Sequence, residues 1–546
     1  MPTVTLNKKR VLELLGKKYD DKFLADRIAM LGTDLESITD TEIIVEVFPN
    51  RPDMLSEEGL ARGLRSFLGI ETGFKKYEVK KSGFSTTNAN PLPYWPYVVT
   101  AIVKGLELDD AKIRQIIQIQ EKLGITLLRK RKKGGIGLYP LDRIKMPIKF
   151  VSDAPEKIRY RPLEYPEVIS GKEILEKHPT GKTYAHICND WKKITYFVDA
   201  SGTIMSMPPI VNSYDVGKID EKTKDVFIEA TGTDLNTLKI ALNIVVTALA
   251  DMGGKIYSME IIQGNEKFTT PDLTPSKRKI DRKYVNKLLG LELTDAEMKQ
   301  LLAKMGIGFE AGSALIPAYR ADILHPMDLV EDIAIAYGYE NFDAQIPKVA
   351  TIGEESRGAI LKRKIAEVLS GLGFLECNTY HLSNGKDLIE KMNAKKTSLV
   401  KLSNSVNIDY DAMRNAILPI LMKVLSENRH NEYPQRIFES GIVFAEDSKE
   451  ETGVSERASL SAVSVHPNVD FSEIKATLDA LMRAFDIKYE MKEKEYSSYI
   501  SGRCAEIVVA GKSVGMIGEL HPQVLNNWEI EMPVAGFEID VEMVFE

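Results

Sequence analysis

The chain is organised around the stretch Ala318-Tyr-Arg-Ala-Asp322-Ile-Leu-His-Pro326-Met-Asp328-Leu-Val-Glu331-Asp332-Ile-Ala-Ile-Ala-Tyr337-Gly-Tyr-Glu-Asn-Phe342. Pro326 predicts the first residue of a helix, because proline lacks the N–H group that would be unsatisfied at that position. Apolar residues then recur at helical spacing and predict one apolar face, made of Leu329, Val330, Ile333, Ala336 and Tyr337.

Acidic residues occupy another face of this predicted helix. Asp328, Glu331 and Asp332 are spaced i, i+3 and i+4, and Asp322 comes within reach if the chain turns before Pro326. Four carboxylates that converge in this way suit Mg²⁺ or Ca²⁺, not zinc. Acids in the first turns of a helix also complement its dipole while they remain solvated, so the spacing alone leaves both interpretations open.

The resemblance of the complete stretch to a known family decides between these two interpretations. Its Pro-Ala-Tyr-Arg-Ala-Asp-Ile, Asp-Leu-Val-Glu-Asp-Ile-Ala and Tyr-Gly-Tyr-Glu-Asn segments closely resemble the metal-binding domain of phenylalanyl-tRNA synthetase beta subunits. In that family the matching acids hold a magnesium ion. The resemblance therefore implies a structural Mg²⁺ site at Asp322, Asp328, Glu331 and Asp332, in a small domain that resembles nucleic-acid-binding domains.

Length and composition set broad limits. A chain of 546 residues is too long for one core and predicts several domains. The absence of a run of about 18 apolar residues predicts no membrane-spanning helix and no membrane partner, and the first residues lack a signal-peptide core. Three widely separated cysteines argue against a zinc or disulfide framework and predict a reducing, cytoplasmic location.

The charge balance is acidic. A net charge of −7 does not fit a protein that coats nucleic acid, so any RNA contact must come from local basic clusters. Two such clusters are Arg129-Lys-Arg-Lys-Lys133 and Lys277-Arg-Lys279, which continues to Arg282-Lys283. On charge alone, each is more typical of a solvated loop than of a binding site.

Two stretches in the second quarter of the chain resemble the editing domain of the same family, Met207–Ser213 and Val226–Asp234. An editing pocket must hydrolyse an ester and distinguish tyrosine from phenylalanine by the phenol hydroxyl. No Ser-His-Asp or Cys-His set is apparent, so we expect a positioned water and no covalent intermediate. The same stretches are also good turn sequences. The candidate residues are Asn212, Ser213, Glu229 and Thr231.

The last third of the chain resembles the class II synthetase fold, an antiparallel sheet flanked by helices. Active class II domains carry an ATP-clamping arginine near their C-terminus, whereas no arginine follows Arg503 here. Without that cation a triphosphate loses charge-assisted contacts, so we expect a scaffold without its own active site. The helix predicted over Arg357–Leu372 has an apolar face that we expect to pack against a partner subunit.

These observations predict an α+β, multidomain chain. The expected domains are an N-terminal α/β domain (1–80), an editing domain (81–265), the Mg²⁺-binding, nucleic-acid-binding-like domain (266–346) and the inactive synthetase-like domain (347–546). Ser82–Pro96 has the composition of a linker.

The chain is identified as a member of the archaeal-type beta subunit family of phenylalanyl-tRNA synthetases. This implies a ligase holoenzyme that uses ATP and Mg²⁺, an alpha subunit that carries synthesis, an α2β2 assembly, and tRNA(Phe) as partner. This chain would supply editing, tRNA contacts, the Mg²⁺ site and the subunit interface. Two alternatives remain: a non-catalytic tRNA-binding scaffold, and a Mg²⁺-dependent phosphoryl-transfer enzyme that uses the four acids catalytically.

Overall fold

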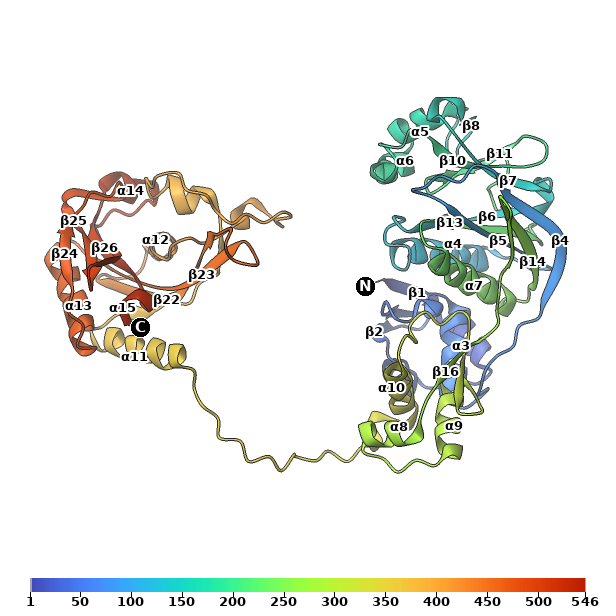
Figure 1. The fold of residues 1–546 in the computed structure, drawn as a ribbon, viewed down its shortest axis with the longest axis horizontal. Helices are drawn as coiled ribbons and strands as arrows, with labels where there is room; N and C mark the ends of the chain where they lie inside the picture. Colours follow the sequence, from blue (N-terminus) through green and yellow to red (C-terminus); the bar gives the residue numbers. More distant parts are fainter. Residues whose placement is uncertain (1, 546) are drawn as a thin grey trace. The chain divides into compact units, whose positions relative to one another are not determined.

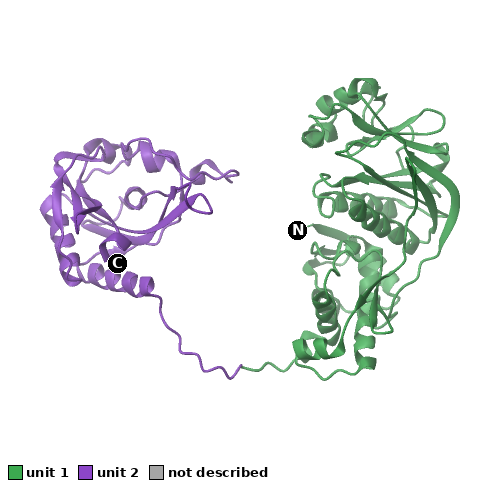
Figure 2. Cartoon of the chain, viewed as in Figure 1, with its two compact units in different colours: residues 1–346 green, residues 347–546 purple. Residues whose placement is uncertain are grey.

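The computed structural model describes residues 2–545 and divides into two compact units, Met1–Ile346 (unit 1) and Pro347–Glu546 (unit 2) (Figure 2). Each unit combines helices with β-sheet (Figure 1), which confirms the mixed α+β, multidomain class. Among the helices of residues 2–545, none combines the length and the apolar character needed to cross a bilayer.

Unit 1 begins with a three-stranded sheet of order β1-β3-β2. Two of its helices begin at capping residues: the side chain of Asn7 accepts a hydrogen bond from the Arg10 N–H, and that of Ser56 accepts one from the Gly59 N–H. Cap side chains satisfy N–H groups that a helix cannot pair itself. The elements are β1 (Thr3–Asn7), α1 (Lys8–Leu15), α2 (Asp21–Met30), β2 (Asp34–Ile38), β3 (Glu42–Glu46) and α3 (Glu57–Phe67).

A ten-stranded sheet forms the centre of unit 1, in the order β12-β11-β10-β7-β4-β14-β5-β13-β6, with β15 paired to β14. Two helices, α4 (Asp110–Ile125) and α7 (Leu235–Asp251), accompany it (Figure 1). The short helices α5 (Gly171–Lys177) and α6 (Pro179–Tyr184) follow the small β8–β9 hairpin. The strands are β4 (Val79–Asn88), β5 (Tyr97–Lys104), β6 (Gly134–Pro140), β7 (Ile148–Asp153), β8 (Arg159–Tyr160), β9 (Ile169–Ser170), β10 (Ile194–Val198), β11 (Ile204–Met207), β12 (Val211–Asn212), β13 (Val226–Gly232), β14 (Lys255–Gln263) and β15 (Glu266–Thr270).

The predicted linker at Ser82–Pro96 is wrong over its first half, because β4 occupies Val79–Asn88. This strand pairs in parallel with both β14 and β7. The hydroxyl groups of Thr86 and Thr100 lie 3.1 Å apart inside the sheet. Pairing on both sides outweighs a serine- and threonine-rich composition, since strand preference depends strongly on tertiary context.

The last part of unit 1 contains the acidic helix. Pro326 is the first residue of α10 (Pro326–Tyr337), as predicted, and Thr294 and Glu297 form a capping box at the start of α9 (Asp295–Lys304). The largest hydrophobic core of the unit includes Leu60 of α3, Val245 of α7 and Ile333 of α10, and two smaller clusters lie around Phe197 and Ile174. The remaining elements are α8 (Arg282–Leu289) and a sheet of order β16-β18-β17, made of β16 (Ser276–Lys279), β17 (Gly308–Glu310) and β18 (Ser313–Ile316).

Unit 2 is built on a seven-stranded sheet of order β19-β22-β23-β27-β26-β25-β24. Every neighbouring pair in this sheet is antiparallel except β19 with β22. The strands are β19 (Leu375–Glu376), β22 (Gln435–Glu446), β23 (Val454–Val465), β24 (Glu490–Glu493), β25 (Tyr499–Val509), β26 (Lys512–Leu520) and β27 (Val534–Asp540), with a separate pair β20 (Leu382–Ser383) and β21 (Ala412–Met413). The helices are α11 (Arg357–Gly371), α12 (Leu418–Glu427), α13 (Phe471–Ala484), α14 (Pro522–Asn527) and α15 (Val541–Phe545).

The expectation that the apolar face of α11 packs against a partner subunit is wrong. Ile365 and Leu369 are fully buried in the core of unit 2 itself, and Leu361 and Val368 pack against the same core. The face is covered by elements of its own unit, including α13. Sequence periodicity shows that a helix has an apolar face but does not show which element covers it.

Candidate functional site

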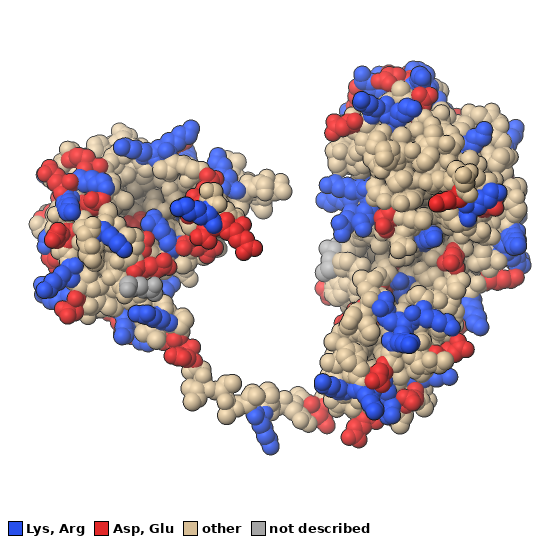
Figure 3. Space-filling model, viewed as in Figure 1, with Lys and Arg blue, Asp and Glu red and all other residues tan. Residues whose placement is uncertain are grey.

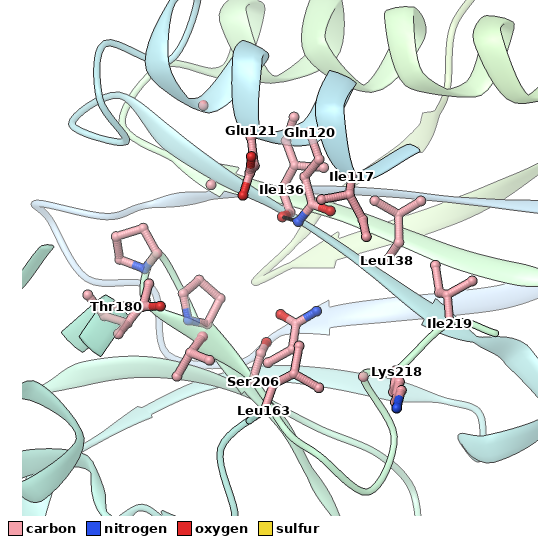
Figure 4. A pocket seen from close by; sticks show the side chains of 18 of the residues that line it. Ile117, Gln120, Glu121, Ile136, Leu138, Leu163, Thr180, Ser206, Lys218 and Ile219 are labelled. Carbon is pink, nitrogen blue, oxygen red and sulfur yellow. Dashed lines mark hydrogen bonds between the residues drawn. The ribbon is translucent and has the colours of Figure 1, made fainter. Parts of the chain in front are cut away.

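A cavity of about 510 Å³ lies in unit 1 between α4 and strands β6, β11, β12 and β13. Figure 4 shows Gln120 and Ile136 on one side of this space, opposite Ser206 and Leu163. Most of the lining is apolar, as expected for a site that holds an organic ligand. The apolar lining residues include Ile113, Ile116, Ile117, Ile136, Leu138, Leu163, Pro208, Pro209, Ile210 and Ile219.

A polar cluster interrupts this apolar wall. The Tyr139 hydroxyl oxygen lies 3.2 Å from Asn212 Oδ1 and 3.2 Å from Glu229 Oε1. Asn212 and Glu229 line the cavity, and Tyr139 is fully buried behind them. Three strands distant in sequence, β6, β12 and β13, therefore contribute one group each.

Gly137 makes room for this cluster. In the antiparallel pairing of β6 with β13, Gly137 lies opposite Glu229. A Cβ atom at Gly137 would lie 2.4 Å from Glu229 Oε1 and 2.6 Å from the Tyr139 hydroxyl oxygen, both closer than van der Waals contact permits. A residue without a side chain at this position is therefore required for the carboxyl group to reach the tyrosine.

The Glu229 carboxyl group has an unusual environment. Glu229 is 2 % exposed, and its Oε2 atom has no hydrogen-bond partner among the described residues. Burial raises the pKa of Glu229 to about 8, although the hydrogen bond from Tyr139 acts in the opposite direction. Ser206, also at the cavity, interacts through its hydroxyl with the Tyr139 hydroxyl. Buried polar atoms are normally paired, so Glu229 Oε2 is available to a ligand or water.

Only two of the four predicted pocket residues line the cavity. Thr231 Oγ1 accepts a hydrogen bond from Trp95 Nε1 at 3.1 Å, and Ser213 Oγ accepts one from the Asp215 N–H at 3.3 Å. Neither Thr231 nor Ser213 belongs to the lining, whereas Asn212 and Glu229 do.

The sequence reasoning missed Tyr139 and Ser206. Tyr139 shares a strand face with Gly137, two residues earlier, and this alternation is visible in the sequence. Its distance from Glu229 follows only from the register of β6 on β13.

The four acids near α10 do not form one ligand set. The Arg320 guanidinium pairs with Asp322 (Nε–Oδ1 2.8 Å, Nη2–Oδ2 2.6 Å) and with Asp332 (Nη2–Oδ2 2.9 Å). Asp328 Oδ2 accepts hydrogen bonds from the N–H groups of Leu324 and His325, which caps the helix.

Glu331, the fourth acid, is exposed. Within residues 2–545, no three histidine, cysteine, aspartate or glutamate side chains are grouped as a metal site. As arranged here, the four acids do not fit Mg²⁺, because a buried arginine already neutralises two of them.

Comparisons with known proteins match this chain to one family along its whole length. The family model of the phenylalanyl tRNA synthetase beta chain CLM domain matches residues 343–541, and the tRNA synthetase B5 domain matches residues 278–339. The chain is 39% identical to the phenylalanine–tRNA ligase beta subunit of Pyrococcus horikoshii, over 99% of both chains. It is 37% identical to that of Methanocaldococcus jannaschii, over 99% of this chain and 100% of the relative.

A solved structure is also similar. The crystal structure of an N-terminal fragment of the phenylalanyl-tRNA synthetase beta subunit from Pyrococcus horikoshii matches with a TM-score of 0.60 and 38% sequence identity, and covers 62% of this chain and 100% of the fragment. Sequence identities of 37% and 39% to relatives that are matched over nearly their full length show that the chain is a member of their family. The chain belongs to the family of phenylalanine–tRNA ligase beta subunits.

Proposed function

We propose that the cavity lined by Asn212, Ser206 and Glu229 removes tyrosine from mischarged tRNA(Phe). The chain is a component of phenylalanine–tRNA ligase, which joins phenylalanine to tRNA with ATP and Mg²⁺ and pairs this subunit with an alpha subunit. Hydrolytic editing on this chain goes beyond that shared role. The observation that carries the proposal is a buried, unpartnered carboxyl oxygen at the wall of an apolar cavity.

The cavity supplies what hydrolysis of an aromatic aminoacyl ester requires. Its apolar walls accommodate an aromatic ring, and the Ser206 and Asn212 side chains in its lining offer hydrogen bonds to a phenol group. A site with such groups favours tyrosine over phenylalanine, because the ligand without the hydroxyl forgoes that hydrogen bond. No covalent intermediate is required if a water molecule attacks the ester carbonyl.

Glu229 is the proton acceptor in this proposal. Because its pKa is raised to about 8, the ionised Glu229 carboxylate is a stronger base than an ordinary carboxylate and accepts a proton from an attacking water in the fraction of molecules that are ionised. Tyr139 and Asn212 are positioning residues: the Tyr139 hydroxyl contacts Oε1, which leaves Oε2 unpaired for the attacking water. The proton later passes from Glu229 to the leaving ribose hydroxyl.

The test is deacylation of tyrosyl-tRNA(Phe) by the assembled ligase. Glu229→Gln preserves volume but cannot accept the proton, and we expect deacylation to fall by at least about 100-fold while phenylalanine attachment continues. Ser213→Ala serves as the matched control, because Ser213 lies outside the lining. Unchanged deacylation by Glu229→Gln would refute the proposal and leave this region as a non-catalytic tRNA-binding scaffold.

We also propose that the synthetase-like region of residues 347–546 has no synthetic site of its own. A cavity of about 370 Å³ lies against β23, β26 and β27. Arg457 is the one lysine or arginine in its lining, and its Nη1 lies 3.3 Å from Asp540 Oδ2. A triphosphate would therefore meet no free cation there. In this proposal the alpha subunit carries ATP-dependent synthesis, and two copies of each chain form an α2β2 assembly.

The remaining domain roles are proposals of the same kind. Residues 1–80 act as a supporting N-terminal domain, residues 81–265 as the editing domain, and residues 266–346 as a tRNA-facing domain. The structural Mg²⁺ at Asp322, Asp328, Glu331 and Asp332 stays a prediction that the present side-chain arrangement does not support, since Arg320 pairs with Asp322 and Asp332. The same pairing removes the basis for the phosphoryl-transfer alternative.

A further inference from the structure

A turn of unusual backbone conformation follows α4 beside the cavity. Arg129, Lys130 and Arg131 have φ angles of 50°, 52° and 62°. Non-glycine residues seldom adopt this left-handed conformation, and three in succession are rarer still. Residues held in this way indicate a segment whose shape is imposed by its surroundings. The basic turn, defined as residues 129–133, is such a segment.

Backbone contacts fix the basic turn to α4 and to Thr233, the residue that follows β13. The N–H groups of Lys130 and Arg131 donate to the carbonyl oxygens of Ile125 and Gly124, each at 2.9 Å. The Thr233 N–H donates to the Lys133 carbonyl oxygen at 2.9 Å. The turn is therefore tied at both ends to elements that line the cavity.

The Arg131 side chain anchors the middle of the turn. Its Nη1 donates to the carbonyl oxygens of Pro209 and Ile210 at 3.0 and 2.9 Å, and its guanidinium lies 4.3 Å from the centre of the Tyr184 ring. Arg131 also lines the cavity. Burial lowers the pKa of Arg131. Its hydrogen bonds show that this side chain holds the turn in place.

The other side chains are left free. Arg129, Lys130 and Lys132 are exposed, and none of the three forms an ion pair with an acid within the described part of the chain. Many exposed basic residues elsewhere are paired, such as Arg114 with Asp110 and Lys177 with Glu173. Figure 3 shows lysine and arginine side chains gathered at the left edge of unit 1. Because the backbone of the basic turn is fixed, these three cations are held close to one another on the surface.

We infer that Arg129, Lys130 and Lys132 bind phosphates of the single-stranded acceptor end of tRNA while its terminal ester occupies the cavity. This inference rests on the proposed function. A cavity of about 510 Å³, with Arg131 in its wall, admits an aminoacyl group and its terminal nucleoside at most, so the preceding phosphates remain outside it. Cations fixed at that place position a strand without reading its sequence.

The experiment uses the assembled ligase with Arg129→Gln, Lys130→Gln and Lys132→Gln combined in this chain. Glutamine keeps a side chain at each position, so backbone strain is unchanged, and the Arg131 anchor stays intact. The matched control combines Lys145→Gln, Lys149→Gln and Lys255→Gln, which removes three exposed charges from the same sheet region away from the lining. KM and kcat for deacylation of tyrosyl-tRNA(Phe), and the dissociation constant for uncharged tRNA(Phe), are measured over a series of salt concentrations.

We expect KM to rise about tenfold with kcat unchanged, and the control to behave as wild type. Each phosphate contact with a single strand contributes about 0.7 to the slope of log affinity against log salt, so the slope should fall by about 2. Equal KM, dissociation constant and salt slope in the triple variant and the control would overturn the inference. Loss of the alpha subunit from the triple variant, seen by size-exclusion chromatography, would assign the turn to a protein partner and also overturn it.

Failure of the proposed function gives a different result. In that case Glu229→Gln deacylates as fast as wild type, and the tRNA dissociation constant with its salt slope still decides whether the turn binds phosphates. Should the triple variant not fold, Lys132→Glu gives the same test by charge reversal at a residue outside the left-handed run. A weakened, less salt-dependent tRNA affinity in that single variant supports the inference, and wild-type affinity contradicts it.

Discussion

Tyr139 and Glu229 share one hydrogen bond, 3.2 Å between the tyrosine hydroxyl and Oε1, although they are 90 residues apart in the chain. The same hydroxyl lies 3.2 Å from Asn212 Oδ1. A hydroxyl group has a single proton to donate. When Glu229 is protonated on Oε1 it can donate to Tyr139, which then donates to Asn212. When Glu229 is ionised, Tyr139 donates to the carboxylate, so the charge of the cavity and the orientation of its polar groups are coupled.

The first prediction concerns pH and activity. Burial raises the pKa of Glu229 to about 8, so the carboxyl group is mostly protonated at pH 7 and becomes a proton acceptor as pH rises. The enzymatic rate of tyrosyl-tRNA deacylation, after subtraction of the uncatalysed rate, should increase through an inflection at about pH 8 and level off at higher pH. Glu229→Gln should remove this inflection, and a pH profile that is identical in both proteins would contradict the assignment.

The raised pKa of Glu229 leads to a second prediction, which concerns the stability of the folded protein. Because the folded pKa lies above the ordinary value of 4.5, the folded state binds more protons than the unfolded state between these values. The stabilisation is fully present below the unfolded pKa and is lost as pH rises through about 8. The thermal unfolding transition of unit 1 should therefore fall more steeply from pH 5 to pH 8 in wild type than in Glu229→Gln. Equal slopes would show that Glu229 is not protonated in the folded protein.

A third prediction addresses the space beside the carboxyl group. Gly137→Ala places a Cβ atom 2.4 Å from Glu229 Oε1, so the carboxyl group must move away from Tyr139. We expect a loss of about 1–3 kcal/mol in stability from overpacking and a large loss of deacylation. Attachment of phenylalanine should persist. Gly202→Ala, at an open position in the same region, controls for the loss of a glycine, although its positive φ adds strain of its own.

The fourth prediction separates an ion pair from a metal site. Arg320→Met leaves Asp322 and the buried Asp332 without their partner, and we expect a loss of about 3–5 kcal/mol in stability. Adding Asp322→Asn and Asp332→Asn should recover part of this loss, because no buried charge is then unpaired. In wild type, Mg²⁺ or a chelator should leave the midpoint of thermal unfolding unchanged. A clear upward shift with Mg²⁺ would instead support the magnesium site.

The last prediction concerns synthesis. The isolated chain should not catalyse phenylalanine-dependent exchange between ATP and pyrophosphate, since the Arg457 guanidinium in the unit 2 cavity is paired with Asp540. Exchange should appear when the alpha subunit is added. Exchange by the pure isolated chain would overturn the view of residues 347–546 as a scaffold.

The sequence alone determined the local elements and the family. Pro326 predicts a helix start that the structure confirms, and Asn7, Ser56 and Thr294 cap three other helices in the same local way. Caps and first-turn prolines act within three or four residues, so their effect can be predicted before any tertiary contact is known. The motif around Asp322–Phe342 indicated the family in the same way, because a long contiguous match does not depend on packing.

Tertiary structure decided which of the predicted side chains meet. Asn212 and Glu229 reach the cavity, while Thr231, on the same strand as Glu229, bonds to Trp95. Tyr139 joins Glu229 only through the register of β6 on β13. Arg320, inside the decisive stretch itself, neutralises two acids that spacing alone predicted as metal ligands. The spacing of residues along a helix or strand shows which side chains can share a face. Charge pairing and strand register depend on contacts between residues far apart in the sequence, and these contacts form only when the chain has folded.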